Sequence, residues 1–99
     1  MYRKGQKANT VQFSVRPKSA KSVAVAGDFN GWKPAPMRRR TDGSYSAELV
    51  VSPGRHEYKF IIDNCWVQDP DVHESVPNAY GTLNSTFLVE RAKEYAHTY

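Results

Sequence analysis

The chain has 99 residues, of which 39% are hydrophobic, 12% aromatic and 24% charged. This length suffices for one domain with one core, and it excludes a catalytic barrel. No apolar run approaches the ~18 residues of a membrane span, and the basic N-terminus lacks an apolar signal core. The only cysteine, Cys65, excludes an intrachain disulfide and mildly favours a reducing compartment. We therefore expect a cytoplasmic protein without a membrane segment.

The net charge of +4 is unevenly distributed along the chain. Residues 1–40 contain ten basic side chains and one acid, a balance of +9, whereas residues 41–99 contain four basic and nine acidic, a balance of −5. Such asymmetry can indicate nucleic-acid binding, two complementary faces, or nothing beyond solubility.

Short segments with strand patterns follow one another, separated by turn residues. In the first, 10–16, Val11, Phe13 and Val15 alternate with polar residues, which is typical of a half-buried strand. Turn signals recur every ~8–12 residues, which indicates an antiparallel sandwich. The fold class is therefore all-β: a single immunoglobulin-like antiparallel β-sandwich without the disulfide. The other expected strands are 22–27, 36–40, 44–51, 55–63, 64–68 and 85–90, with a loop at 69–84.

The segment 58–68 predicts a β-hairpin with the turn Asp63-Asn64, because Asp and Asn tolerate positive φ. Ile61 then lies opposite Trp66, and side chains alternate between the two faces. The expected core face carries Phe60, Ile62, Cys65 and Val67, and the outer face carries Lys59, Ile61, Trp66 and Gln68. Trp66 therefore projects outward, with Lys59 as its diagonal neighbour.

An exposed tryptophan beside a lysine and a glutamine suits a polar ligand that has one apolar face. Sugars are such ligands, because the axial-hydrogen face of a pyranose is apolar and its rim is hydroxylated. An indole is a large rigid surface with little conformational entropy to lose. The stretch "GDFNGWKPAP" places a second tryptophan, Trp32, in a segment of turn residues, where we expect Phe29 to anchor the loop and Asn30-Gly31 to turn it.

Four motifs carry a resemblance to a known family: G-x-F-N-x-W, P-G-x-x-x-Y-K-F, W-x-x-D-P and N-x-x-G-x-x-N, in this order. Together they resemble the family-48 carbohydrate-binding modules, early-set domains that include the glycogen-binding domain of the AMP-activated protein kinase beta subunit. The resemblance covers residues 11–89. It implies binding of α-1,4-linked glucans such as glycogen, starch or maltodextrins.

The resemblance also implies roles for individual residues. Trp32 and Trp66 match the two sugar-stacking tryptophans of the family. Lys59 and Asn84 match residues that hydrogen-bond glucose hydroxyls, and Thr82 matches a nearby hydrogen-bonding threonine. Tyr80 stands where the kinase subunit has a leucine that inserts into the turn of the glucan, so it could stack or hydrogen-bond instead.

Each of these residues also has a plainer interpretation. Trp66 could lie in a protein interface, Trp32 could cover the core, and Lys59 could be a solvated strand lysine. Asn84 could be a turn residue before the last strand. The run Arg38-Arg39-Arg40 is expected to be a charged edge that resists aggregation, with nucleic-acid contact as the alternative.

Catalysis and metal binding are not expected. Glu57 lies on the outer strand face, but one acid cannot do the work of the two carboxylates in glycoside hydrolysis. No nucleophilic triad, phosphate-binding loop, cofactor motif or metal-ligand spacing occurs. The three histidines are His56, His73 and His97.

The sequence therefore predicts a non-catalytic glucan-binding sandwich at 10–90, with a basic arm at 1–9 and a tail at 91–99 that could form a helical turn or two. The alternative is a regulatory or scaffold module of a larger kinase subunit or glucan-processing enzyme, with a vestigial sugar site. Its partner would then be a protein or a fused catalytic domain. Nucleic acid is the less favoured partner, because Trp66 lies beside one lysine rather than in a basic groove.

Overall fold

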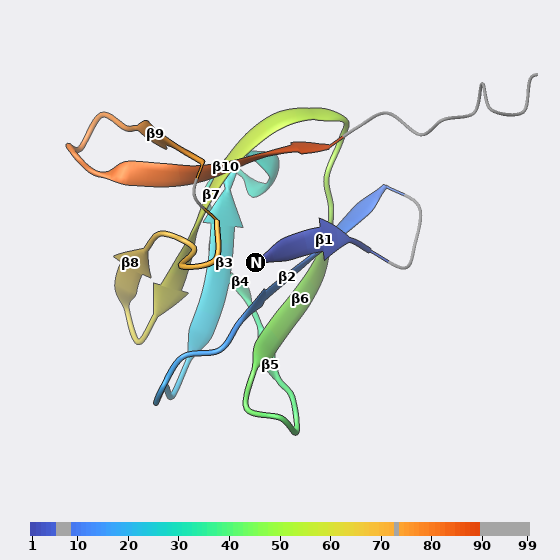
Figure 1. Cartoon of the computed structure of the whole chain (residues 1–99), viewed down its shortest axis with the longest axis vertical. Coiled ribbons are helices and arrows are strands. Elements are labelled where there is room, and N and C mark those ends of the chain that lie inside the picture. Colours follow the sequence, from blue (N-terminus) through green and yellow to red (C-terminus); the bar gives the residue numbers. More distant parts are fainter. Residues whose placement is uncertain (6–8, 73, 90–99) are drawn as a thin grey trace, which may run out of the picture.

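Among the residues that the structure describes, ten strands form two antiparallel sheets, seen in the computed structural model in Figure 1. The structure describes residues 1–5, 9–72 and 74–89, and no helix within them is long and apolar enough to cross a membrane. The four-stranded sheet contains, in spatial order, β1 (Tyr2–Lys4), β2 (Thr10–Val15), β6 (Tyr45–Val50) and β5 (Arg38–Arg39). The six-stranded sheet contains β4 (Ala35–Pro36), β3 (Val23–Gly27), β7 (Gly54–Ile62), β10 (Leu83–Val89) and β9 (Ser75–Pro77), with β8 (Cys65–Val67) also paired to β7.

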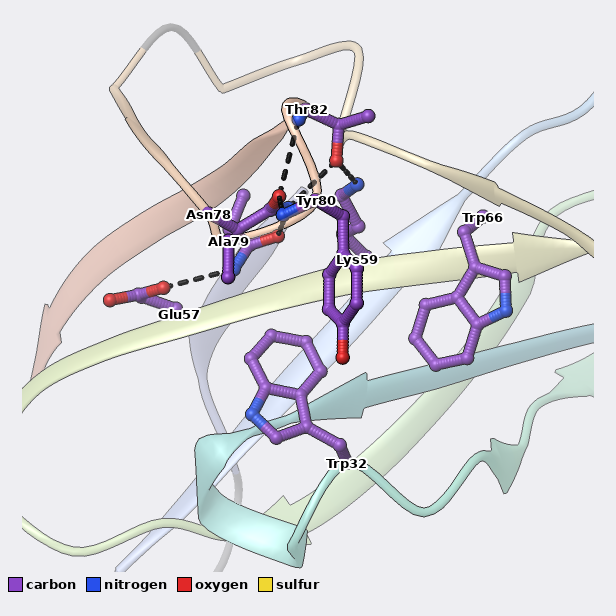
Figure 2. A pocket seen from close by; sticks show the side chains of 9 residues that line it. Trp32, Glu57, Lys59, Trp66, Asn78, Ala79, Tyr80 and Thr82 are labelled. Carbon is purple, nitrogen blue, oxygen red and sulfur yellow. Dashed lines mark hydrogen bonds between the residues drawn. The ribbon is translucent and has the colours of Figure 1, made fainter.

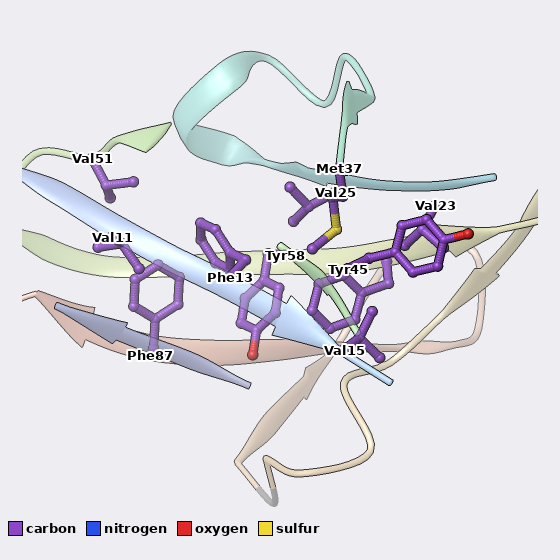
Figure 3. Close-up of a cluster of buried hydrophobic side chains, with 11 residues drawn as sticks. Val11, Phe13, Val15, Val23, Val25, Met37, Tyr45, Val51, Tyr58 and Phe87 are labelled. Atoms are coloured by element: carbon purple, nitrogen blue, oxygen red, sulfur yellow. The ribbon is translucent and has the colours of Figure 1, made fainter. Parts of the chain in front are cut away.

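Both sheets contribute side chains to one core (Figure 3). The fully buried rings of Phe13 from β2, Tyr58 from β7 and Phe87 from β10 lie with centroids 5.2 to 5.7 Å apart. Fully burying a large apolar side chain contributes roughly 1.5–3 kcal/mol, so these rings account for much of the attraction between the sheets. The expected antiparallel sandwich is confirmed, and the alternation in 10–16 correctly identified the buried Val11, Phe13 and Val15.

The segment expected to form one strand at 36–40 forms two. β4 pairs with β3 in one sheet and β5 pairs with β6 in the other, and Met37 between them is buried in the core. The chain therefore crosses from sheet to sheet at Met37. Arg38 and Arg39 are exposed on β5, which is an edge strand, as expected for a charged edge.

Two strands were not expected from the sequence. β1 lies within the segment predicted to be a basic arm, and its Tyr2 packs on Phe87 with ring centroids 4.7 Å apart. β9 lies within the segment predicted to be a loop, and β10 begins two residues before the expected start. Both missed strands are three residues long, which is too short for a side-chain period to stand out. The expected tail at 91–99 lies outside the described residues.

The β7–β8 hairpin has the predicted register: Phe60 pairs with Val67, Ile61 with Trp66 and Ile62 with Cys65. Asp63 and Asn64 form the turn with φ of 50° and 72°, as a two-residue hairpin of this twist requires. Cys65, however, was expected in the core and is exposed. It follows the turn at the tip of the β7–β8 hairpin, which Figure 1 shows extending away from the four-stranded sheet.

Candidate functional site

The loop that carries Trp32 is anchored in the core. It begins with the 3₁₀ turn η1 (Asp28–Asn30), whose Phe29 stacks on Phe13 with ring centroids 5.3 Å apart. The Asn30 side chain accepts a hydrogen bond from the backbone N–H of Gly27 at 3.0 Å, and the N–H of Trp32 donates to the Gly27 carbonyl at 2.9 Å. The predicted roles of Phe29 as anchor and Asn30-Gly31 as turn agree with this geometry.

Trp32 has a backbone conformation that bulky residues rarely adopt. Its φ is 62°, directly after Gly31 with φ of 66°. Left-handed backbone costs a non-glycine residue of order 1–3 kcal/mol and is found most often at functional sites. The fold thus holds the half-buried Trp32 in a strained position rather than placing it in the core.

The same loop is attached to β7 by polar contacts. Asp28 accepts a hydrogen bond from the Glu57 N–H at 3.0 Å, and its other oxygen lies 2.7 Å from Nδ1 of His56. A Cβ atom on Gly27 would lie 2.3 Å from the Phe29 ring and 2.6 Å from the Glu57 carbonyl oxygen. Only glycine therefore allows the Trp32 loop to lie this close to β7.

Lys59 and Trp66 project from the outer face of the β7–β8 hairpin, as the predicted register requires. Trp66 is 47% exposed. Lys59 is only 8% exposed, and its Nζ donates a 2.8 Å hydrogen bond to Oγ1 of Thr82. Lys59 is therefore not a solvated strand lysine, because its ammonium group is held in one place.

Asn78 organises the turn between β9 and β10. Its Oδ1 accepts hydrogen bonds from the N–H groups of Tyr80 at 2.9 Å and Thr82 at 3.2 Å. Its Nδ2 donates to Oγ1 of Thr82 at 2.7 Å and to Oδ1 of Asn84 at 2.9 Å. One side chain thus holds three of the six predicted site residues.

Asn84 lies within β10 and is buried, so it is not a turn residue. Its Nδ2 donates a 2.9 Å hydrogen bond to Oε1 of Glu57. Together with the bonds of Asn78, this contact completes a polar chain of five side chains: Glu57, Asn84, Asn78, Thr82 and Lys59.

All six predicted site residues line a single pocket of about 810 Å³ on the outer face of the six-stranded sheet (Figure 2). Trp32 and Trp66 flank the pocket, and in the view of Figure 2 the ring of Tyr80 lies between the two indoles. Tyr80 is 90% exposed, so the pocket is open to solvent on its side. The residues that line it are Trp32, Glu57, Lys59, Trp66, Asn78, Ala79, Tyr80, Thr82 and Asn84.

Three of the lining residues were not predicted as site residues: Glu57, Asn78 and Ala79. Asn78 is the first residue of the N-x-x-G-x-x-N motif, which is the signal that could have identified it. Glu57 was placed correctly on the outer face but was considered only as a catalytic acid. Nothing in the local sequence indicates Ala79.

The pocket carries one group of each charge, Lys59 and Glu57, at the two ends of the polar chain. Among the described residues, no group of three or more His, Cys, Asp or Glu side chains is placed to hold a metal ion. The site thus offers aromatic surfaces and fixed hydrogen-bonding groups, which suits recognition of a hydroxylated ligand.

Residues 10–95 match the family described as the glycogen recognition site of AMP-activated protein kinase. The chain is 34% identical over 71 residues to 5'-AMP-activated protein kinase subunit beta-1 of Sus scrofa, a match that covers 72% of this chain and 57% of that protein. It is 40% identical over 57 residues to Protein PTST homolog 2, chloroplastic, of Arabidopsis thaliana, covering 57% of this chain and 11% of that one. The chain thus spans only part of these relatives.

Among solved structures, a maltogenic amylase from S. marinus aligns with a TM-score of 0.72 and 25% identity, over 95% of this chain and 15% of that one. A putative alpha amylase from Salmonella typhimurium aligns with a TM-score of 0.65 and 21% identity, over 93% and 15%. The second likeness concerns the fold alone. Because the family match extends over most of the chain, the chain belongs to the family of the glycogen recognition site of AMP-activated protein kinase.

Proposed function

We propose that this protein binds α-1,4-linked glucans such as glycogen, starch or maltodextrins, without catalysing a reaction on them. The observation that carries the proposal is the meeting of two tryptophans from separate segments, Trp32 from a loop and Trp66 from β8, at one open pocket. Membership of a glycogen-recognition family supports the same class of ligand.

In this proposal the indoles of Trp32 and Trp66 stack on the apolar faces of glucose units, and the exposed ring of Tyr80 adds a third surface. Polar groups hold the hydroxyl rim: two N–H groups of the Lys59 ammonium remain after its bond to Thr82, and the Thr82 hydroxyl still has a hydrogen to donate. Asn84, which already contacts two neighbours, has one N–H left for a sugar. The openness of the pocket suits a long chain that passes through rather than a buried small molecule.

The non-catalytic role follows from the carboxylates. Glu57 is the one acid among the residues that line the pocket, and its Oε1 is already bonded to Asn84. Hydrolysis of a glycosidic bond generally requires two carboxyl groups on opposite sides of the scissile bond. We therefore expect incubation with maltoheptaose to release no shorter sugars.

The test is a titration of the intact protein with maltoheptaose, followed by tryptophan fluorescence and calorimetry, and repeated with Trp66→Ala. We expect the substitution to weaken binding by about tenfold or more, which corresponds to ~1.4 kcal/mol. Leu88→Ala is the matched control, because Leu88 is exposed on β10 and is not among the pocket residues. An intact protein that binds no glucan, or an unchanged affinity in Trp66→Ala, contradicts the proposal.

A second candidate function is a regulatory or scaffold module within a larger protein. The observation that favours it is the partial coverage of the relatives, which are named as a kinase subunit and amylases. A folded chain that binds no glucan would favour this candidate. Binding to single-stranded DNA with steep salt dependence would favour nucleic acid instead.

A further inference from the structure

The amide side chains in the polar chain across the pocket floor have fixed orientations. The polar chain runs from the Glu57 carboxylate, which accepts hydrogen bonds, to the Lys59 ammonium, which only donates them. Between these ends, Asn84 must turn its Nδ2 toward Glu57 and its Oδ1 toward Nδ2 of Asn78. If Asn84 were flipped, its oxygen would face the Glu57 carboxylate. The Glu57 carboxylate therefore determines which way the Asn84 amide faces, and with it the hydrogen-bonding group that Asn84 presents to the pocket.

One carboxylate oxygen of Glu57 remains available for a ligand. Its Oε1 accepts the hydrogen bond from Asn84, whereas its Oε2 has no hydrogen-bond partner among the residues that the structure describes. The side chain is only partly buried and lines the pocket, so this oxygen is available to a ligand. Glu57 is held in place by Asn84 on one side and by the Asp28 contact to its backbone on the other.

We propose that Glu57 contacts the bound sugar directly and makes the pocket select neutral glucans over anionic ones. This inference rests on the proposed function, glucan binding at the same pocket. Oε2 of Glu57 would accept a hydrogen bond from a glucose hydroxyl, and a hydrogen bond to an ionised acceptor is stronger than one between neutral groups.

The selectivity follows from the charges that line the pocket. Lys59 alone would attract a phosphate or carboxylate on a sugar, and Glu57 is the one lining group that repels it. For a neutral glucan both groups contribute hydrogen bonds. An anionic sugar is attracted by the charge of Lys59 but repelled by the charge of Glu57, so the two electrostatic contributions to its binding oppose each other. Rejection of an unwanted ligand by a like charge is a common source of specificity.

Glu57→Gln isolates this role. A glutamine keeps Oε1 as the acceptor for the Asn84 amide and replaces Oε2 by an NH2 group, so the polar chain survives while the free acceptor and the charge are lost. The control is Glu74→Gln, which removes the same charge from an exposed position that is not among the pocket residues. Trp66→Ala serves as the control for the site itself.

The ligands are β-cyclodextrin and its mono-6-phosphate, titrated by calorimetry. We expect Glu57→Gln to weaken β-cyclodextrin binding by about fivefold to tenfold. We also expect Glu57→Gln to raise the ratio of the affinity for the cyclodextrin phosphate to the affinity for β-cyclodextrin by about threefold or more. Glu74→Gln should change neither quantity, and the melting temperature of Glu57→Gln should stay near that of the intact protein.

Several outcomes would overturn the inference. If Trp66→Ala weakens binding while Glu57→Gln leaves affinity and selectivity unchanged, glucan binding stands but Glu57 is not a contact. An equal loss for both ligands together with a lowered melting temperature would show a purely structural role. An equal change of selectivity in Glu74→Gln would show an effect of net charge. If the intact protein binds neither ring nor maltoheptaose, the proposed function itself fails.

Discussion

Asn78 and Thr82 are joined by three hydrogen bonds that close the turn carrying Tyr80: Asn78 N–H to the Thr82 carbonyl, Thr82 N–H to Asn78 Oδ1, and Asn78 Nδ2 to Thr82 Oγ1. The first of these bonds needs no side chain, the second needs a side-chain oxygen at position 78, and the third needs a side-chain donor there. The amide also reaches Asn84 on β10, so the turn and the pocket floor share one organising residue.

Asn78→Asp should separate these two roles. The carboxylate can still accept from the N–H groups of Tyr80 and Thr82, but it cannot donate to Asn84 and places an oxygen against Asn84 Oδ1. We expect binding of maltoheptaose to weaken by about fivefold to tenfold, since the Nδ2 donor to Asn84 and Thr82 is lost. The side-chain amide signal of Asn84 in an NMR spectrum should shift as well. If the Asn78→Asp variant binds maltoheptaose as tightly as the intact protein, Nδ2 of Asn78 is not needed for binding.

The strained backbone of Trp32 predicts a difference between two variants. Trp32→Ala and Trp32→Gly both remove the indole, so both should lose most of the affinity for maltoheptaose. Because φ is 62° here, glycine should be the more stable replacement by about 1 kcal/mol, measured by urea denaturation. Two variants of equal stability would show that the backbone relaxes once the indole is gone.

Tyr58→Phe should destabilise the fold from within the core. The Tyr58 hydroxyl donates a 2.6 Å hydrogen bond to Asp69, a buried carboxylate that also contacts the Asp71 N–H and the Met1 amine. Burial, with the adjacent Asp69 as a second cause, raises the pKa of Tyr58, so the hydroxyl keeps its proton across the physiological range.

Removing that hydroxyl leaves the buried Asp69 with one donor fewer, which typically costs about 1–3 kcal/mol. Thermal or urea denaturation measures the loss. The matched control is Tyr80→Phe, because Tyr80 is 90% exposed and should tolerate the change without loss of stability. A Tyr58→Phe variant as stable as its control would mean that water or another donor replaces the hydroxyl.

Asp63 at the hairpin turn predicts an acid dependence of stability. Hydrogen bonds from the N–H groups of Ser22 and Lys21 hold the pKa of Asp63 below its usual 3.8. A carboxyl whose pKa is lowered on folding stabilises the fold above its unfolded pKa, and this contribution disappears as the pH falls through the lowered value.

In Asp63→Asn the amide oxygen can accept the same two bonds, but the group no longer titrates. The free energy of unfolding of this variant should therefore decline less steeply below about pH 4 than that of the intact protein. Denaturation at a series of pH values measures both curves, with Glu74→Gln as the control. Parallel curves for Asp63→Asn and the intact protein would contradict the prediction.

Local patterns sufficed for parts of both sheets and for part of the site. The period of two identified the buried residues of β2, and the Asp63-Asn64 turn determined the β7–β8 register and with it the outward direction of Trp66. These features depend on residues a few positions apart in the sequence, because strand and turn geometry alone determines which face each side chain takes. The family motifs then singled out six residues, and the structure brings these six to one pocket.

The tertiary structure decided what depends on contacts between distant segments. Only packing of Phe29 on Phe13, and the absence of a side chain at Gly27, bring Trp32 to the same pocket as Trp66. The exposure of Cys65 depends on how far the opposite sheet extends, which no local pattern encodes. The chain from Glu57 to Lys59 through Asn78 joins side chains up to 27 positions apart, and such hydrogen bonds form only once the strands that carry them lie side by side.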